Sequence, residues 1–197
     1  GVLNAEEFIE VAEKMGVISK IDLILMEKAF EKAKNEKYDG LLFINLSPKS
    51  LILGEFIPNV LKLTRQYDID RSKVVFEITE RDTVKNISLL EKFVDNLRFE
   101  GFKFAVDDFG SGFSSFHYVK RFPLDFVKIE GEFIRSMYRD KRDMAIVKTL
   151  LVLSHEFNIR TIAESVENKD IAEAIKMLGI DYGQGYHIGR PSPELVK

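Results

Sequence analysis

The chain has 197 residues, of which 45% are hydrophobic and 31% are charged, a composition typical of a globular protein with a sizeable core. Its net charge of −3 argues against a nucleic-acid polymer as the partner, because binding that polymer needs a surplus of Lys and Arg on one face. The absence of cysteine excludes a disulfide framework, and no apolar run is long enough to span a bilayer. We therefore expect a single cytoplasmic domain, residues 1–197, without membrane contact of its own.

Two helices are expected at the start of the chain. In the first, Asn4 is the capping residue with Glu7 three positions later, and Gly16 ends the apolar periodicity. The second helix follows Ser19 and gives way to the charged run 31–37, which is typical of a solvated face.

From residue 41 onward, short apolar strands alternate with helices. The predicted strands cover residues 41–45, 74–79, 102–106, 125–129, 159–163 and 181–186. The predicted helices cover residues 56–67, 87–99, 116–121, 133–157 with a break near 139–142, and 171–178. Six strands that alternate with helices indicate a parallel sheet with both faces covered, either a barrel or a doubly wound sheet.

The polar residues at the strand ends favour the barrel. Each predicted strand has one polar residue at or near its carboxyl end: Asn45, Glu77, Asp107, Lys128, Glu164 and Gln184. In a barrel these ends meet on one face, where the catalytic groups of that fold lie, whereas a doubly wound sheet brings only one or two together. No GxGxxG motif follows an early strand, which argues against a nucleotide cofactor. We predict an α/β fold of the TIM (βα)8 barrel type, with a site on this face.

The segment FAVDDFGSGFSS, residues 104–115, lies at the centre of this pattern. Successive residues of a strand point to opposite faces, so Asp107 and Asp108 serve one site only if the backbone turns sharply there. Gly110 and Gly112 allow such a turn.

The predicted site consists of oxygen ligands and one lysine. Carboxylate and amide oxygens favour hard divalent cations, so we expect Mg²⁺ or Mn²⁺, and paired metals commonly serve the hydrolysis of phosphodiesters. Lys128 lies between Val127 and Ile129, and if it points inward it can orient or deprotonate the hydrolytic water or offset phosphate charge.

Each of these residues alone also has an ordinary structural explanation. Glu77 has the setting of a surface-facing strand residue, Asn45 can bond its own turn, and Lys128 can lie at the rim of the sheet. Carboxylates near glycines are common in turns. Only the joint pattern, one polar group at each strand end, supports a functional site.

The chain resembles the EAL family of bacterial cyclic-di-GMP phosphodiesterases over nearly its whole length. The resemblance rests on six motifs in order: AEEFIEVAEKMGVI (5–18), INLSPKSL (44–51), FEITERD (76–82), FAVDDFGSGFSSFHYVKRFPLDFVKIE (104–130), IAESVE (162–167) and GQGYHIGRP (183–191). It implies a modified (βα)8 barrel that hydrolyses cyclic-di-GMP to linear pGpG with Mg²⁺ or Mn²⁺.

The resemblance also implies roles for individual residues. The metal site would comprise Asn45, Glu77, Asp107, Asp108 and Glu164. Lys128 and Glu164 would be catalytic, and Gln184 would lie beside the substrate. Glu80 would pin the loop that contains Gly110, Ser111 and Gly112, which couples dimerisation to metal binding in the family. A homodimer, fused to sensor or cyclase domains in a longer parent protein, is therefore expected.

Several departures from the family pattern affect these expectations. The Glu-Ala-Leu strand that names the family, with its metal-binding glutamate, has no counterpart here, so we expect a barrel truncated at its amino end and an activity that is weak or absent in this chain. Glu130 and Ser165 stand where the family usually has Asp and Gly. The alternatives are a catalytically silent cyclic-di-GMP receptor or dimerisation domain, and another metal-dependent barrel enzyme with a lysine base.

Overall fold

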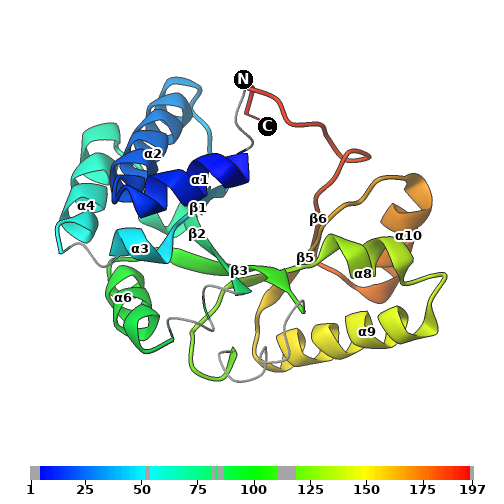
Figure 1. Cartoon of the computed structure of the whole chain (residues 1–197). Coiled ribbons are helices and arrows are strands. Elements are labelled where there is room, and N and C mark those ends of the chain that lie inside the picture. The colour runs from blue at the N-terminus through cyan, green and yellow to red at the C-terminus, as the bar shows by residue number, and fades with distance from the viewer. Residues whose placement is uncertain (1–4, 52–53, 81–82, 84–86, 111–118, 196–197) are drawn as a thin grey trace. The chain divides into compact units, whose positions relative to one another are not determined.

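The computed structural model describes residues 5–51, 54–80, 83, 87–110 and 119–195 (Figure 1). The strands form one sheet in which they follow each other in chain order, from β1 to β6. The chain divides into two compact units. The first contains residues 1–76, 88–103 and 195–197, and the second contains residues 77–87 and 104–194.

The first unit is mainly helical. Its helices are α1 (Ala5–Lys14), α2 (Ile18–Asn35), α3 (Pro48–Leu51), α4 (Phe56–Tyr67) and most of α6 (Ile87–Phe99). It also holds β1 (Leu42–Asn45), the short 3-10 helix η1 (Arg71–Lys73) and the first half of β2 (Val74–Thr79). Helix α2 packs against α4, and the fully buried Phe30 of α2 and Val60 of α4 belong to its core. Burial of such side chains stabilises the unit by ~2 kcal/mol each.

A buried carboxylate orders the chain after β1 in this unit. Asp22 of α2 is 5% exposed and accepts hydrogen bonds from the Ser47 amide at 3.3 Å and the Ser50 hydroxyl at 2.5 Å. Burial raises the pKa of Asp22, and this effect exceeds the opposing effect of the two serine bonds. The short helix α3 is thereby attached to α2.

The second unit contains most of the sheet. Its strands are the end of β2, β3 (Lys103–Phe109, from Phe104 onward), β4 (Phe126–Ile129), β5 (Arg160–Ala163) and β6 (Tyr182–Gly183). Strands β3 to β6 pair in parallel, and Ile129 at the end of β4 is opposite Ala163 at the end of β5. All four residues of β4 are buried, which is typical of a parallel strand covered on both faces.

Among the described residues, the helices that accompany these strands are α8 (Gly131–Ser136), α9 (Lys141–Glu156) and α10 (Lys169–Leu178). The side chains of Asp140 and Asn168 cap α9 and α10 by accepting hydrogen bonds from backbone N–H groups of the first turn. Helix α9 packs against β4, β5 and α8. Strand β4 is thus connected to β5 through α8 and α9, and β5 is connected to β6 through α10, as in a TIM-type barrel.

The order of the helices and strands agrees well with the prediction from the amino-acid sequence. All six strands are present, and 74–79, 56–67 and 87–99 have the predicted bounds. The break between α8 and α9 lies at residues 137–140, close to the predicted 139–142. Helix α2 continues to Asn35, through most of the charged run that was expected to follow it, because Glu and Lys are good helix formers.

Other boundaries differ or lie outside the described residues. Strand β3 extends to Phe109, and β6 contains only Tyr182 and Gly183. The one-turn elements α3 and η1 are too short to give a periodic signal and were not predicted. The proposed cap Asn4 and residues 116–118 of the predicted helix 116–121 lie outside the described residues; of the remainder, Val119 is helical and Lys120 and Arg121 form a turn.

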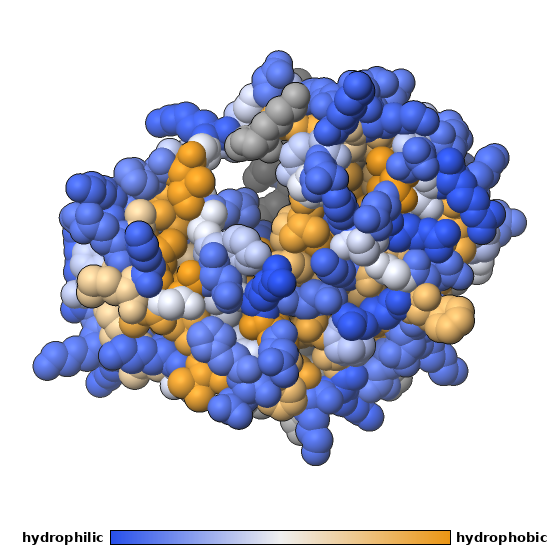
Figure 2. All heavy atoms as spheres, turned by 180° about the vertical axis from the view of Figure 1, so that it is seen from behind, coloured by the Kyte–Doolittle hydropathy of each residue, from blue (hydrophilic) through white to orange (hydrophobic). Residues whose placement is uncertain are grey.

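On the face seen in Figure 2, hydrophilic side chains predominate and hydrophobic ones are interspersed among them. None of the described helices combines the length and apolar character needed to cross a membrane.

Candidate active site

The buried ammonium group of Lys128 contacts three carboxylates. Lys128 on β4 is 5% exposed, and its Nζ is 2.9 Å from Asp107 Oδ1 on β3 and 2.9 Å from Glu164 Oε1 after β5. Glu77 Oε1 on β2 is 3.4 Å away and is also buried. Four predicted site residues from four neighbouring strands therefore meet in the second unit, because parallel strands bring their carboxyl ends to the same edge of the sheet.

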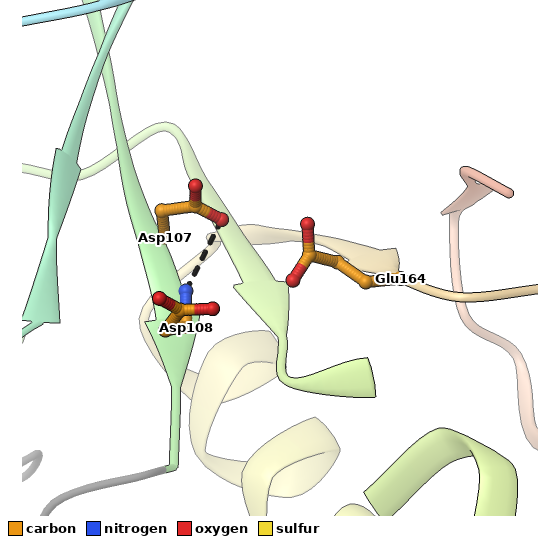
Figure 3. A group of neighbouring side chains, drawn as sticks. All are labelled: Asp107, Asp108 and Glu164. Atoms are coloured by element: carbon orange, nitrogen blue, oxygen red, sulfur yellow. Dashed lines mark hydrogen bonds between the residues drawn. The ribbon is translucent and has the colours of Figure 1, made fainter. Parts of the chain in front are cut away.

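Three carboxyl groups beside this lysine surround a common space. One oxygen each from Asp107, Asp108 and Glu164 lies within 4.8 Å of the other two (Figure 3). We call these three residues the acidic cluster. An all-oxygen set of this kind suits a hard divalent cation.

The backbone at Asp108 brings both aspartates to this space. Asp108 has a φ of +56°, in the left-handed region, and the pairing of β3 with β4 shifts register between Val106 and Phe109. The Asp108 N–H donates a hydrogen bond to Asp107 Oδ1 at 3.1 Å. The sharp turn expected from the glycines thus begins at Asp108 itself, two residues before Gly110, because Asp is one of the few residues that tolerate this conformation.

The electrostatics of the site show an excess of negative charge. Burial raises the pKa of Glu77 and Glu164, and Lys128 opposes this effect only in part. Burial and then the neighbouring Asp107 raise the pKa of Asp108. For Lys128, burial lowers the pKa, but the three carboxylates outweigh burial and raise it above its ordinary value. One ammonium group does not balance these carboxyl groups, so the cluster fits an additional cation.

Glu130 adds to this negative charge. It precedes α8, and burial and the nearby Asp108 raise its pKa. The carboxyl group that replaces the expected Asp therefore lies within the electrostatic influence of the acidic cluster.

Glu80 fixes the chain at the end of β3. It is 1% exposed, and its Oε2 accepts a hydrogen bond from the Gly110 N–H at 2.8 Å. Gly110 has a φ of +106°, which favours glycine, and an added Cβ would be 3.0 Å from Leu150 Cδ1. Ser111 and Gly112, the other predicted loop residues, lie outside the described residues.

The two remaining predicted residues lie at strand ends. Gln184 follows β6 and is exposed, and its backbone bonds the Ala163 carbonyl and the Val166 amide. Asn45 is the exposed last residue of β1 and belongs to the first unit.

Sequence reasoning did not find Arg135. This residue of α8 donates a hydrogen bond from Nη1 to the Ser165 hydroxyl at 2.8 Å, directly after Glu164. The two residues are 30 positions apart, and no local pattern relates a surface arginine to a loop serine at that separation.

The fold and the site together define a TIM-barrel-like α/β protein with acidic and basic groups gathered at the carboxyl ends of its strands. The chain belongs to the EAL domain family, whose model matches residues 1–191. It is 38% identical to cyclic di-GMP phosphodiesterase PdeB of Shewanella oneidensis and 35% identical to PdeF of Escherichia coli, over 98% of this chain in both cases. It covers 23% and 26% of those proteins, so the chain spans about a quarter of the length of these curated relatives.

Solved structures give the same result. The MucR phosphodiesterase in complex with cyclic-di-GMP superposes with a TM-score of 0.90 at 28% identity, over 98% of this chain and 80% of that one. The EAL enzyme Bd1971, bound to cAMP and cyclic-di-GMP, has a TM-score of 0.88 at 26% identity, over 97% of this chain and 54% of that one. The predicted α/β fold of TIM-barrel type is thus confirmed.

Proposed function

We propose that this chain is a phosphodiesterase domain that hydrolyses cyclic-di-GMP to linear pGpG. The observation that carries the proposal is the ion-pair centre at Lys128, where carboxylates from three neighbouring strands surround one buried ammonium group. Membership of the EAL family supports the substrate, because the relatives PdeB and PdeF are named cyclic di-GMP phosphodiesterases.

The acidic cluster is the proposed site of Mg²⁺ or Mn²⁺. Asp107, Asp108 and Glu164 offer oxygens within 4.8 Å of one another. We assign Glu77, which contacts the same lysine, as a further ligand. A divalent cation there would supply Lewis acidity toward the phosphodiester and would favour ionisation of the attacking water. Its charge would also oppose the burial and the carboxylate repulsion that together raise the pKa of Glu77, Asp108 and Glu164.

Lys128 is proposed to act as a charged hydrogen-bond donor. The carboxylates beside it raise its pKa, so the side chain keeps its proton and its N–H groups can orient the hydrolytic water and the phosphate. Glu164, whose pKa is raised by burial, is the proposed proton acceptor. Gln184, at the end of β6, is proposed to contact the substrate.

The regulatory roles follow from the segment after β3. We propose that Glu80 orders this segment through Gly110, and that Ser111 and Gly112 participate in coupling a homodimer to metal binding. The proposed setting is a cytoplasmic domain joined to sensor or cyclase domains, since the curated relatives are about four times as long as this chain.

The proposal is tested by incubating the chain with cyclic-di-GMP and Mn²⁺ and measuring pGpG by liquid chromatography. The test is repeated with the chain extended at its amino end by a Glu-Ala-Leu strand of the family. Asp107→Asn is expected to abolish turnover, and Asp95→Asn, at an exposed site on α6, is the matched control. Calorimetry with cyclic-di-GMP distinguishes the alternatives, because binding without pGpG in both proteins would indicate a receptor. Absence of both binding and turnover would refute the proposal.

A further inference from the structure

Ser165 adopts a backbone conformation that is unusual for a residue other than glycine. Its φ is +53°, in the left-handed region, and it directly follows Glu164. The residues on either side are anchored to different neighbours. The Glu164 N–H donates to the Ile129 carbonyl at 3.3 Å, and the Val166 N–H donates to the Gln184 carbonyl at 2.9 Å. The backbone conformation at Ser165 therefore determines the orientation of Glu164 after the end of β5.

The side chain of Ser165 is half-buried and lies against helix α8. Its hydroxyl accepts the hydrogen bond from Arg135 Nη1 at 2.8 Å. The first residue of the helix, Gly131, leaves the space that this hydroxyl fills, because a Cβ built at Gly131 would be 2.2 Å from Ser165 Oγ. Residues four apart lie on one face of a helix, so Gly131 and Arg135 contact the same serine. We call these three residues the Ser165 clamp.

We propose that Arg135 is a positioning residue that, through Ser165, holds Glu164 in the orientation needed by the acidic cluster. This inference rests on the proposed function of Glu164. Arg135 acts through the turn, because its hydrogen bond is to Ser165 and Glu164 is the preceding residue. A left-handed conformation is costly for serine and persists only where contacts around it determine it. The bond from Arg135 and the space at Gly131 are two of those contacts, beside the backbone bonds of Glu164 and Val166.

The clamp differs from an ordinary surface hydrogen bond in one expected result: Ser165→Gly alone should keep the Mn²⁺ affinity, although it removes the hydroxyl that accepts the bond from Arg135. Glycine adopts the left-handed region without strain, so a glycine at position 165 should make Arg135 dispensable. Arg135→Ala should therefore weaken Mn²⁺ binding when residue 165 is serine. It should have almost no effect on that binding when residue 165 is glycine.

The experiment is a double-mutant cycle of Arg135→Ala and Ser165→Gly in this chain. Mn²⁺ affinity is measured by calorimetry, and kcat and KM for cyclic-di-GMP are measured separately. Arg135→Ala is expected to weaken Mn²⁺ binding about tenfold and to lower kcat, while KM changes by less than about twofold, because residues that orient ligands typically affect affinity on this scale. In the Ser165→Gly background, Arg135→Ala is expected to alter the Mn²⁺ affinity and kcat by less than about twofold each.

Two further variants complete the test. Arg135→Lys keeps a donor for the serine hydroxyl and should restore part of the affinity, and it also serves as the second variant if Arg135→Ala does not fold, as judged by circular dichroism. Arg142→Ala removes an exposed arginine of α9 and should have no effect. An equal effect of Arg135→Ala in both backgrounds would overturn the inference, as would unchanged Mn²⁺ affinity.

The outcomes separate this inference from the proposed function. If the wild-type chain binds Mn²⁺ but does not hydrolyse cyclic-di-GMP, the proposed function fails while the cycle still tests the clamp through metal affinity. If the wild-type chain hydrolyses cyclic-di-GMP and Arg135→Ala has no effect, only the clamp fails. If the wild-type chain does not bind Mn²⁺, the inference is overturned together with the metal site.

Discussion

Replacing Lys128 by methionine tests the electrostatic account of the site most directly. Methionine has a similar length and keeps the apolar contacts of the lysine stem, but it removes the ammonium group. Glu77, Asp107 and Glu164 then lose the cation that lies 3.4, 2.9 and 2.9 Å from them. The change therefore converts a shared ion-pair centre into a group of like charges.

The expected cost follows from the burial of the partners. Removing one member of a buried ion pair typically costs ~3–5 kcal/mol. The side chains of Lys128 and Glu77 are 6% and 7% exposed, but those of Asp107 and Glu164 are 18% and 19% exposed, so water compensates for part of the loss. We expect Lys128→Met to lower the free energy of unfolding by about 3 kcal/mol at pH 7.5 without metal.

The cost should depend on pH. Glu77 and Glu164 already have raised pKa values in the folded protein, and removal of the cation raises them further. A carboxyl group with a raised folded pKa binds more protons in the folded state than in the unfolded state, so its contribution to stability falls as pH rises. The destabilisation by Lys128→Met should therefore be smaller at pH 5.5 than at pH 7.5.

Urea unfolding followed by circular dichroism measures this cost, first with EDTA and then with Mn²⁺. The divalent ion should restore more stability to Lys128→Met than it adds to the wild-type protein, because it meets no competing ammonium group. Hydrolysis should nevertheless be lost. Lys148→Met, at an exposed site on α9, is the control for loss of a lysine. Equal stability of Lys128→Met and Lys148→Met in EDTA at pH 7.5 would refute the reasoning.

Three further predictions concern other parts of the chain. Burial raises the pKa of Asp22, so the stability of the wild-type protein should decrease as pH rises from about 4 through that raised pKa, and urea titrations should show a flatter profile for Asp22→Asn. Glu80→Ala removes the acceptor of the Gly110 N–H and should cost about 1–3 kcal/mol in urea unfolding, whereas an effect below about 0.5 kcal/mol would contradict the anchoring role. Glu164→Gln keeps the size of the side chain but removes its charge, and calorimetry should show at least about a tenfold loss of Mn²⁺ affinity.

The strands and the residues at their ends were predictable from the sequence because both depend on local pattern. In strand 74–79 an apolar run is interrupted by Glu77 and ends at Thr79, and the polar residues at or near the ends of such runs indicated one shared edge of a parallel sheet. Glu77, Asp107, Lys128 and Glu164 accordingly meet in the second unit.

The orientation of the backbone at the site was not predictable in the same way. The glycines of the 104–115 segment indicated a turn, but whether Asp108 itself adopts the left-handed conformation depends on the register shift between β3 and β4. The bond between Arg135 and Ser165 depends on how α8 packs beside the end of β5. Both features are tertiary, and a single sequence contains no periodic signal for them.

The distribution of left-handed residues favours a functional origin for the strain. Five non-glycine residues in the described part of the chain have positive φ. Lys37, Asp68 and Asn158 lie at or just beyond the ends of α2, α4 and α9, where this conformation is a common way to end a helix. Asp108 and Ser165 instead lie at or just after the ends of β3 and β5, where no helix end requires it.

Asp108 belongs to the acidic cluster, and Ser165 directly follows its member Glu164. Each has a contact that supports its conformation: the Asp108 N–H bonds Asp107 Oδ1, and the Ser165 hydroxyl accepts the bond from Arg135. Backbone strain of this kind persists where the surrounding structure maintains it, and it is concentrated at active sites. If the acidic cluster holds the proposed cation, the need to aim carboxylates from two strands at it accounts for strain at these two strand ends.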